Sequence, residues 1–413
     1  MTDTTRPPVT DWATDFDHTR PEYAQHAPEI WEKLRNECPV AHTERFGGTW
    51  LPVRHEDVSA VARDTEHFSS ESIIVSDFKP VDLAPMGYAP PITSDPPFHA
   101  IARRILLPAF SPKEIDRWEE TTRAACREFL DDMLADGVSV VDAATQYTQN
   151  IPVRVIAEML GVPKEDGDKF RTFIHRILEA PGSGNDEDIP HEETLGFYLE
   201  DAIRSRRENP TDNDDLINYL LSVEMDGEPL SGNHIGGTIG LLIIAGIDTT
   251  WSAIGASLWH LAQSPEDRRR LVEDPDVMVF AVEEFLRFYA PVTMARIVAE
   301  ETEIGGCPVN ERDWVLLPFP AANRDPEVFE QADEFVIDRE RNRHLAFGLG
   351  IHRCIGSNLA RMELRVAVEE WIRRIPDFEL ADDDPNAVRW STGQVRGPRE
   401  LPIRILSTAE VSS

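Results

Sequence analysis

The chain has 413 residues, with 41 Lys and Arg against 75 Asp and Glu, which gives a net charge of −34. So acidic a chain is a poor partner for nucleic acid, which binds basic surfaces. Its four cysteines are widely spaced and form no Cys-x-x-Cys pair, so neither a zinc site nor a disulfide framework is expected.

The first part of the chain predicts a mixture of short strands and helices. Residues 38–43 and 49–53 are interpreted as strands around a turn at Gly47-Gly48, and residues 55–63 as a helix. Residues 71–94 are irregular and rich in Pro, Ile and Val, and a long loop of this kind is usually functional or disordered. Residues 112–180 are expected to be helical, and residues 181–193 to form a loop.

A helix is expected to begin at Asp95-Pro96, with Asp95 as its cap and Pro96 in the first turn. His99 and Arg103 stand four residues apart, so they share one face of this helix. Two donors on one face can hold a pair of carboxylates. The alternative is a solvated polar face.

Residues 231–262 predict a long apolar helix. Its uncharged stretch, from Ile235 to Ile247, is shorter than the roughly 20 residues that a membrane span needs. Because the N-terminus also lacks an apolar signal region, we expect a buried core helix in a cytoplasmic protein without membrane association. The helix carries Asp248 and Thr249, and a carboxylate inside an apolar helix is costly unless it is paired or used.

Asp274-Pro275 predicts the start of another helix, which carries Glu284 and Arg287 three residues apart. An i,i+3 ion pair is the simplest interpretation, and on a surface such pairs are weak. Residues 291–298 predict a strand, and residues 396–405 predict terminal strands.

The most distinctive segment reads Phe-Gly-Leu-Gly-Ile-His-Arg-Cys-Ile-Gly-Ser-Asn-Leu-Ala-Arg from Phe347 to Arg361. It begins as a glycine-rich loop and continues as a helix, because apolar residues then recur at helical spacing. Cys354 therefore precedes a helix N-terminus, where unpaired N–H groups and the helix dipole favour an anion. We expect this position to lower the pKa of the thiol and to favour thiolate.

This segment strongly resembles the haem-binding loop of the cytochrome P450 family. The resemblance extends over nearly the whole chain, because the helix of residue 99, the Asp-Thr helix, the Glu-x-x-Arg helix and the cysteine loop follow in family order. It implies one domain over residues 1–413, mainly α with small β-sheets, in the family's triangular helical prism. It also implies haem b with Cys354 as its axial thiolate ligand.

The resemblance carries roles onto individual residues. Thr249 would hydrogen-bond dioxygen, and Asp248 would help to relay protons. Glu284 and Arg287 would form a structural triad with Arg339, or alternatively with Arg341. The cofactor would contact His99, Arg103, Arg296 and His352 at its propionates, and Ala245, Gly246, Phe347, Gly348, Gly350 and Gly356 elsewhere. The substrate pocket would be lined by Ile73, Ile74, Leu241, Ile244, Val292 and Met294.

The implied activity is that of a monooxygenase that hydroxylates or epoxidises a mainly apolar small molecule. Electrons would come ultimately from NAD(P)H, through a separate ferredoxin and ferredoxin reductase, to a monomeric enzyme. Arg104, Arg123, Arg127 and Arg353 would form a local basic patch near Cys354 for these acidic partners. The alternatives are a peroxide-driven or isomerising haem-thiolate enzyme and a haem-based gas sensor. The sequence names neither the substrate nor the natural partner.

Overall fold

The computed structural model describes residues 6–75, 88–135, 137–179, 190–382, 384 and 387–409. Its α-helices are α1 (Pro21–Glu37), α2 (His55–Arg63), α3 (Phe98–Leu106), α4 (Pro112–Asp116), α5 (Glu119–Leu134), α6 (Asn150–Leu160), α7 (Gly167–Ile174), α8 (Leu195–Glu208), α9 (Leu216–Ser222), α10 (Gly232–Gln263), α11 (Pro265–Glu273), α12 (Met278–Phe288), α13 (Phe319–Ala322) and α14 (Ser357–Arg374).

The strands are short and gather in several small sheets. They are β1 (Val40–Thr43), β2 (Thr49–Pro52), β3 (Phe68–Ser69), β4 (Val140–Asp142), β5 (Glu224–Met225), β6 (Glu228–Pro229), β7 (Thr293–Val298), β8 (Thr302–Ile304), β9 (Cys307–Val309), β10 (Trp314–Pro318), β11 (Asp377–Leu380), β12 (Arg389–Trp390), β13 (Pro398–Glu400) and β14 (Pro402–Ser407).

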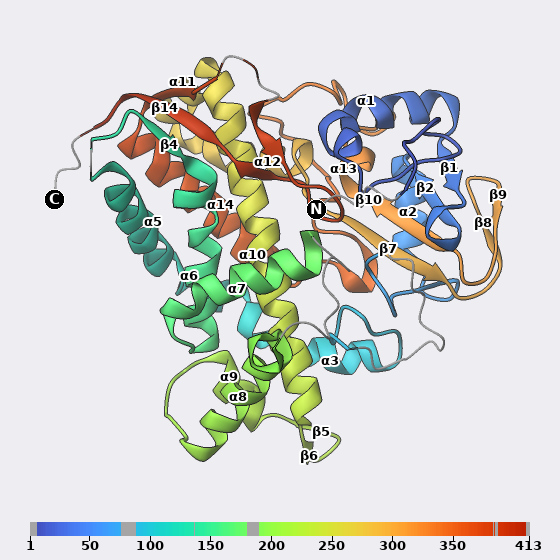
Figure 1. Cartoon of the computed structure of the whole chain (residues 1–413), viewed down its shortest axis with the longest axis horizontal. Helices are drawn as coiled ribbons and strands as arrows, with labels where there is room; N and C mark the ends of the chain where they lie inside the picture. Colours follow the sequence, from blue (N-terminus) through green and yellow to red (C-terminus); the bar gives the residue numbers. More distant parts are fainter. Residues whose placement is uncertain are drawn as a thin grey trace.

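Helix α10 runs through the middle of the molecule, between a helical half and a half that contains the largest sheet (Figure 1). The helix begins within one residue of the predicted start, and the Ser231 side chain caps it by accepting a hydrogen bond from the His234 N–H at 3.1 Å. Among the described residues, only this helix is long and apolar enough to cross a membrane. Of its most apolar stretch, 72% is buried inside the protein, as is typical of a core helix.

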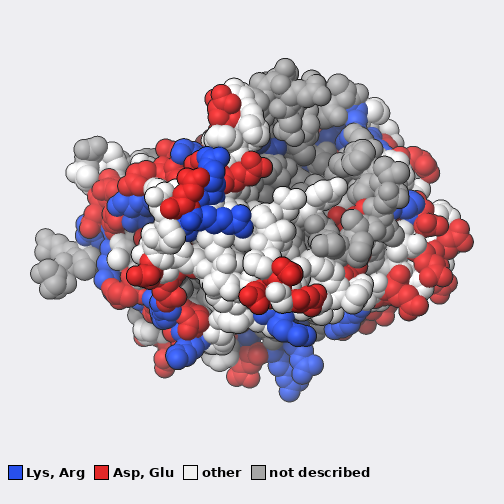
Figure 2. Space-filling view, turned by 90° about the horizontal axis from the view of Figure 1, so that it is seen from below, with Lys and Arg blue, Asp and Glu red and all other residues white. Residues whose placement is uncertain are grey.

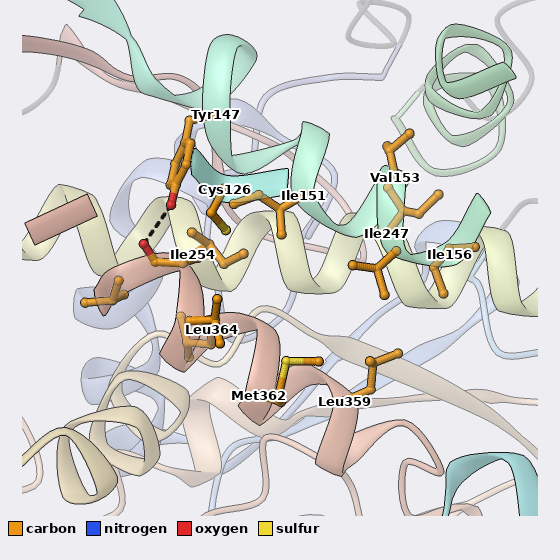
Figure 3. Close-up of a cluster of buried hydrophobic side chains, with 14 of the residues drawn as sticks. Cys126, Tyr147, Ile151, Val153, Ile156, Ile247, Ile254, Leu359, Met362 and Leu364 are labelled. Atoms are coloured by element: carbon orange, nitrogen blue, oxygen red, sulfur yellow. Dashed lines mark hydrogen bonds between the residues drawn. The ribbon is translucent and has the colours of Figure 1, made fainter. Parts of the chain in front are cut away.

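The main core lies between α10, α6 and α14 (Figure 3). Ile247 and Ile254 of α10 meet Ile151 and Ile156 of α6 on one side, and the apolar face of α14 on the other (Figure 3). The buried Tyr147 hydroxyl donates to the Ala367 carbonyl of α14 at 2.8 Å, which satisfies the polar end of this aromatic side chain. The packing holds α10 and α14 in fixed positions.

The largest sheet has the order β1-β2-β10-β7-β3, with β10 parallel to β2 and antiparallel to β7. In β7, Met294 and Arg296 are two residues apart, so their side chains project from the same face of the strand. Both side chains line the central cavity. The strand thus places an apolar and a cationic group side by side.

The elements expected in residues 38–63 and 231–262 are confirmed as β1, β2, α2 and α10. The expectation of helices throughout residues 112–180 was wrong at β4, which pairs with β14 near the C-terminus. The pairing partner lies some 260 residues away, so local sequence gives little sign of it. Residues 76–87 and 181–189, within the two predicted loops, lie outside the described residues.

Candidate functional site

A largely apolar cavity lies between α10 and the loop that carries Cys354. Helix α10 contributes Leu241, Ala245, Gly246 and Thr249 to its wall. The remaining described lining residues come mainly from β7, α3, α14, the segment before β7 and the loop of Cys354; they include Pro91, Ile92, Arg103, Leu106, Phe110, Val292, Met294, Arg296, Ala346, Phe347, Gly348, Leu349, His352, Cys354, Ile355, Gly356 and Ala360.

The cysteine loop is closed by a hydrogen bond from the Cys354 N–H to the Phe347 carbonyl, at 2.8 Å. Gly348 and Gly350 have φ values of +64° and +65°, a region that favours glycine. A Cβ atom at Gly350 would lie 2.9 Å from the Ala62 carbonyl of α2. Gly350 therefore allows the loop to pack against α2, whereas Gly348 lines the cavity itself.

Cys354 lines the cavity, and although the residue is accessible to solvent, its thiol is surrounded by protein atoms. Burial raises the pKa of its thiol, and a hydrogen bond from the Gly356 backbone and the charges of Arg103 and Arg353 only partly oppose this effect. The expectation of a lowered pKa was therefore wrong, because desolvation outweighs the helix N-terminus. A thiolate here needs a metal cation to hold its charge, since metal binding displaces the thiol proton.

Three of the four expected propionate-binding side chains line the cavity, namely Arg103, Arg296 and His352, whereas His99 is not a lining residue and packs beside His352. The His99 and His352 rings are 4.4 Å apart. Burial and the neighbouring charges of Arg296, His99 and Arg103 lower the pKa of His352 to about 2, and burial lowers the pKa of Arg296 to about 10. The buried His99 Nε2 has no hydrogen-bond partner among the described residues. The charges of Arg103 and Arg296 suit this cluster to binding an anion.

Asp95 is the nearby carboxylate, and it does not cap α3 as the sequence predicted. It accepts hydrogen bonds from the Ser69 hydroxyl and the Ser70 N–H, at 2.5 and 2.9 Å. Ser70 Oγ lies 2.9 Å from His352 Nε2. Ser70, itself held by Asp95, thereby fixes the position of the His352 ring. The sequence analysis missed this role of Ser70 and Asp95, because it depends on contacts between segments that are far apart in the chain.

The donor set fits an iron porphyrin. A thiol faces the cavity, the walls are mainly apolar, and the cationic rim can take carboxylates. In α10, a Cβ atom at Gly246 would meet Ile156 Cδ1 of α6 at 2.8 Å, so glycine here lets α10 approach α6. Gly246 thus acts through helix packing besides lining the cavity.

Asp248 and Thr249 point in different directions from α10. Thr249 lines the cavity, and its hydroxyl donates to the Ala245 carbonyl at 2.7 Å. Asp248 is fully buried on another face, where Arg399 Nη2 of β13 lies 2.8 Å from its Oδ1. Arg399 is a partner that sequence reasoning missed, because nothing in its local sequence connects β13 with α10.

Glu284, Arg287 and Arg339 form one network. Arg287 donates to both carboxylate oxygens of Glu284 at 2.7 and 2.8 Å, and Arg339 Nε donates to the same carboxylate at 3.0 Å. The structure thus places Arg339, rather than the alternative Arg341, on Glu284. Asn342 Nδ2 also donates to Glu284 at 3.0 Å, which extends the network toward the segment that enters the cysteine loop.

The expected substrate-pocket residues divide into two groups. Leu241, Val292 and Met294 line the cavity, together with Ala245. Ile73, Ile74 and Ile244 are not among its lining residues; the Ile73 carbonyl instead accepts a backbone hydrogen bond from Ala295 of β7 at 3.0 Å. Pro91 and Ile92 were not singled out from the sequence, although the irregular loop that contains them was.

Comparisons with known proteins agree on one family. The family model for cytochrome P450 matches residues 190–391. The mycinamicin IV hydroxylase/epoxidase of Micromonospora griseorubida is 33% identical over 86% of this chain and 89% of its own. The nocardicin C N-oxygenase of Nocardia uniformis subsp. tsuyamanensis is 33% identical over 90% of this chain and 93% of its own.

Solved structures lead to the same result. CYP109E1 from Bacillus megaterium, in complex with testosterone, has a TM-score of 0.83 at 29% identity and covers 94% of this chain and 100% of its own. The bacillaene polyketide synthase cytochrome P450 of Bacillus subtilis has a TM-score of 0.83 at 28% identity and covers 95% of this chain and 100% of its own. The mainly helical fold class expected from the sequence is confirmed.

Proposed function

This chain belongs to the cytochrome P450 family and is a haem-thiolate monooxygenase, and we propose that Cys354 is its iron ligand and that its substrate is a mainly apolar small molecule. The observation that carries the proposal is the Cys354 sulfur facing an apolar cavity with a cationic rim. The overall reaction would convert a substrate RH, O2, two electrons and two protons into ROH and water. Epoxidation of an alkene has the same balance.

The proposed haem site uses the residues around the cavity. His99, Arg103, Arg296 and His352 would bind the two propionates, and the loop of Phe347, Gly348, Gly350 and Gly356 would support the ring beside Cys354. Ala245 and Gly246 of α10, which also line the cavity, would contact the cofactor as well. When bound, the haem would supply the redox chemistry with dioxygen, and the Cys354 thiolate would tune it by donating electron density.

The reduced, carbon monoxide-bound absorption spectrum tests this proposal. Thiolate ligation gives the strongly red-shifted Soret band for which the family is named, and Cys354→Ser should lose it. A band at the position of histidine-ligated haem in the wild-type protein would contradict the assignment of Cys354. Absence of bound haem would remove the basis for all the proposed residue roles.

We assign Thr249 and Asp248 to proton supply. Thr249→Ala should direct most of the consumed electrons into hydrogen peroxide, because the hydroxyl that faces the cavity is lost. Ser257→Ala is the matched control: its hydroxyl also donates to a carbonyl four residues earlier on α10, Ala253 at 2.8 Å, and does not line the cavity. Equal product per electron pair in wild type and Thr249→Ala would contradict the role.

Electrons would reach this enzyme from ferredoxin and ferredoxin reductase, the partners typical of bacterial relatives, and ultimately from NAD(P)H. We further propose a monomeric, single-domain enzyme of the cytoplasm. The apolar lining of Leu241, Ile92, Val292 and Met294 supports an apolar substrate. Relatives named for mycinamicin IV and nocardicin C suggest a secondary metabolite. Turnover with hydrogen peroxide alone would favour the peroxide-driven alternative.

A further inference from the structure

Asp248 and Arg399 form a buried ion pair between α10 and β13, and we propose that Arg399 is a positioning residue that keeps the Asp248 carboxylate charged for proton delivery to the cavity. The two side chains are 0% and 4% exposed. The inference rests on the proposed role of Asp248 and Thr249 in oxygen activation. It assigns a function to a residue that lies outside the cavity wall.

Neighbouring residues of α10 fix the guanidinium group of Arg399. Its Nη1 donates to Ser252 Oγ at 3.0 Å, and its Cζ lies 4.4 Å from the centre of the Trp251 ring. Position 397, just before β13, must be glycine-sized, because a Cβ atom there would overlap Ser252. The close approach of β13 to α10 therefore sets where the charge of Arg399 lies.

The charge state of Asp248 depends on this contact. A fully buried carboxylate without a compensating cation takes up a proton, because the charged form loses its hydration. A guanidinium within 3 Å reverses this preference. A charged Asp248 can accept a proton from solvent and pass it toward its neighbour Thr249, either after a side-chain rotation or through one water.

The stoichiometry makes this delivery necessary. Formation of ROH and water from RH and O2 consumes two protons with the two electrons, and both protons come from solvent. When proton supply fails to cleave the O–O bond, the same two electrons and two protons convert O2 to hydrogen peroxide. Asp248 is regenerated after each transfer, so the ratio of peroxide released to O2 consumed measures its effectiveness.

Stability alone does not account for a buried pair at this place. Apolar residues of similar volume can fill such a space without the cost of desolvating two charges. Strand β13 pairs with β12, and this hairpin contains another ion pair, Arg389–Glu400. Its side chains are 62% and 56% exposed, so forming it costs much less desolvation energy. Arg389→Gln is therefore the matched control, because it removes an arginine from the β12–β13 hairpin but leaves Asp248 and Arg399 intact.

The first test measures the energetic coupling between Asp248 and Arg399. Thermal unfolding of the haem-loaded protein is compared for Arg399→Gln, Asp248→Asn and the double variant. We expect both single variants to unfold at lower temperature and the double variant to unfold no lower than the less stable single variant. Additive shifts would show that the two residues do not act as a unit and would overturn the proposal.

The second test measures proton delivery. Each variant is supplied with a surrogate ferredoxin and reductase and with 7-ethoxycoumarin as the probe, and peroxide released per O2 consumed is measured in H2O and in D2O. Arg399→Gln should raise this ratio and change its solvent isotope effect as much as Asp248→Asn does. Arg399→Lys should restore part of the wild-type value, and Arg389→Gln should match wild type.

A wild-type ratio and isotope effect in Arg399→Gln, with altered values in Asp248→Asn, would overturn the role of Arg399. A wild-type protein that lacks the thiolate spectrum would instead overturn the proposed function, and with it this inference. The two failures are distinguishable, because the spectrum is recorded before any variant is compared.

Discussion

At the scale of single residues, burial decides the ionisation of the groups around the cysteine loop. Burial raises the pKa of Cys354 despite its place before α14. Burial also raises the pKa of Glu363, on the same helix, to about 8. Both oxygens of Glu363 lie buried without a hydrogen-bond partner among the described residues. The protein thus contains a carboxyl group that is neutral at neutral pH.

Glu363 should make stability depend on pH. Its pKa is 4.5 when unperturbed and about 8 in the folded protein, so the folded state binds more protons between these values. Its contribution to stability is therefore complete below pH 4.5 and is lost as the pH rises through 8, by at most about 1.4 kcal/mol per pH unit. We expect Glu363→Gln to flatten this decline in the unfolding free energy, measured by urea denaturation from pH 5 to 9.

The control is Glu200→Gln, at an exposed position of α8. It should reproduce the wild-type pH profile. A Glu363→Gln profile that follows wild type would mean that Glu363 is charged in the folded protein.

At the scale of elements, the sequence predicts what local pattern determines. The long apolar run indicates α10 almost to the residue, and the glycine-rich segment followed by apolar residues at helical spacing indicates a loop that leads into α14. Asp95 shows where prediction from local sequence fails. The Asp95-Pro96 pair is typical of a helix start, yet the Asp95 carboxylate accepts hydrogen bonds from Ser69 and Ser70 instead of capping α3. Arg399 could not be assigned either, because its partner lies on a helix about 150 positions earlier.

The Glu284 network joins α12 to the segment that enters the cysteine loop, so its loss should disturb the haem site. Glu284→Ala leaves Arg287 buried and without its carboxylate, which costs about 3–5 kcal/mol for a buried pair. We expect little haem-loaded protein, measured as the ratio of Soret to protein absorbance. Asp338→Asn, which breaks the exposed pair with Arg270, should cost less than about 1 kcal/mol and retain haem. Normal haem content in Glu284→Ala would contradict this prediction.

Two neighbouring glycines of α10 allow a test of the cavity wall. A Cβ atom at Gly237 would overlap the Tyr88 carbonyl, whereas one at Gly236 would make ordinary contact with Ile203 at 3.8 Å. Gly237→Ala should displace the segment that carries Ile92, a lining residue, and so weaken binding of 4-phenylimidazole in a spectral titration. Gly236→Ala should bind it as wild type does and gain up to about 1 kcal/mol of stability. Equal affinities would mean that residues 88–92 do not shape the cavity.

At the scale of the whole molecule, the net charge of −34 would repel an acidic electron donor unless a local basic surface attracts it. Two of the four arginines of the expected basic patch, Arg123 and Arg127, form ion pairs in the structure. Arg123 pairs with Glu119, Glu369 and Glu370, and Arg127 also pairs with Glu370. On the face seen in Figure 2, acidic side chains likewise accompany the basic ones. Long-range attraction by these arginines is therefore weaker than their number suggests.

Arg104 and Arg123 should consequently differ when each is changed to Gln. Arg104 is exposed at the end of α3 and forms no ion pair with a described residue, so it is available to an acidic ferredoxin. Its loss should slow reduction of the enzyme by a factor of a few at low salt. The difference from wild type should shrink as salt screens the charges, over about 10 Å at 0.1 M. Arg123→Gln should instead lower the unfolding temperature, because it leaves Glu370 buried beside fewer cations. Stopped-flow reduction at several salt concentrations, beside thermal unfolding, separates the two effects. If Arg123→Gln slowed reduction more than Arg104→Gln did, the paired arginines would be the ones that bind the donor.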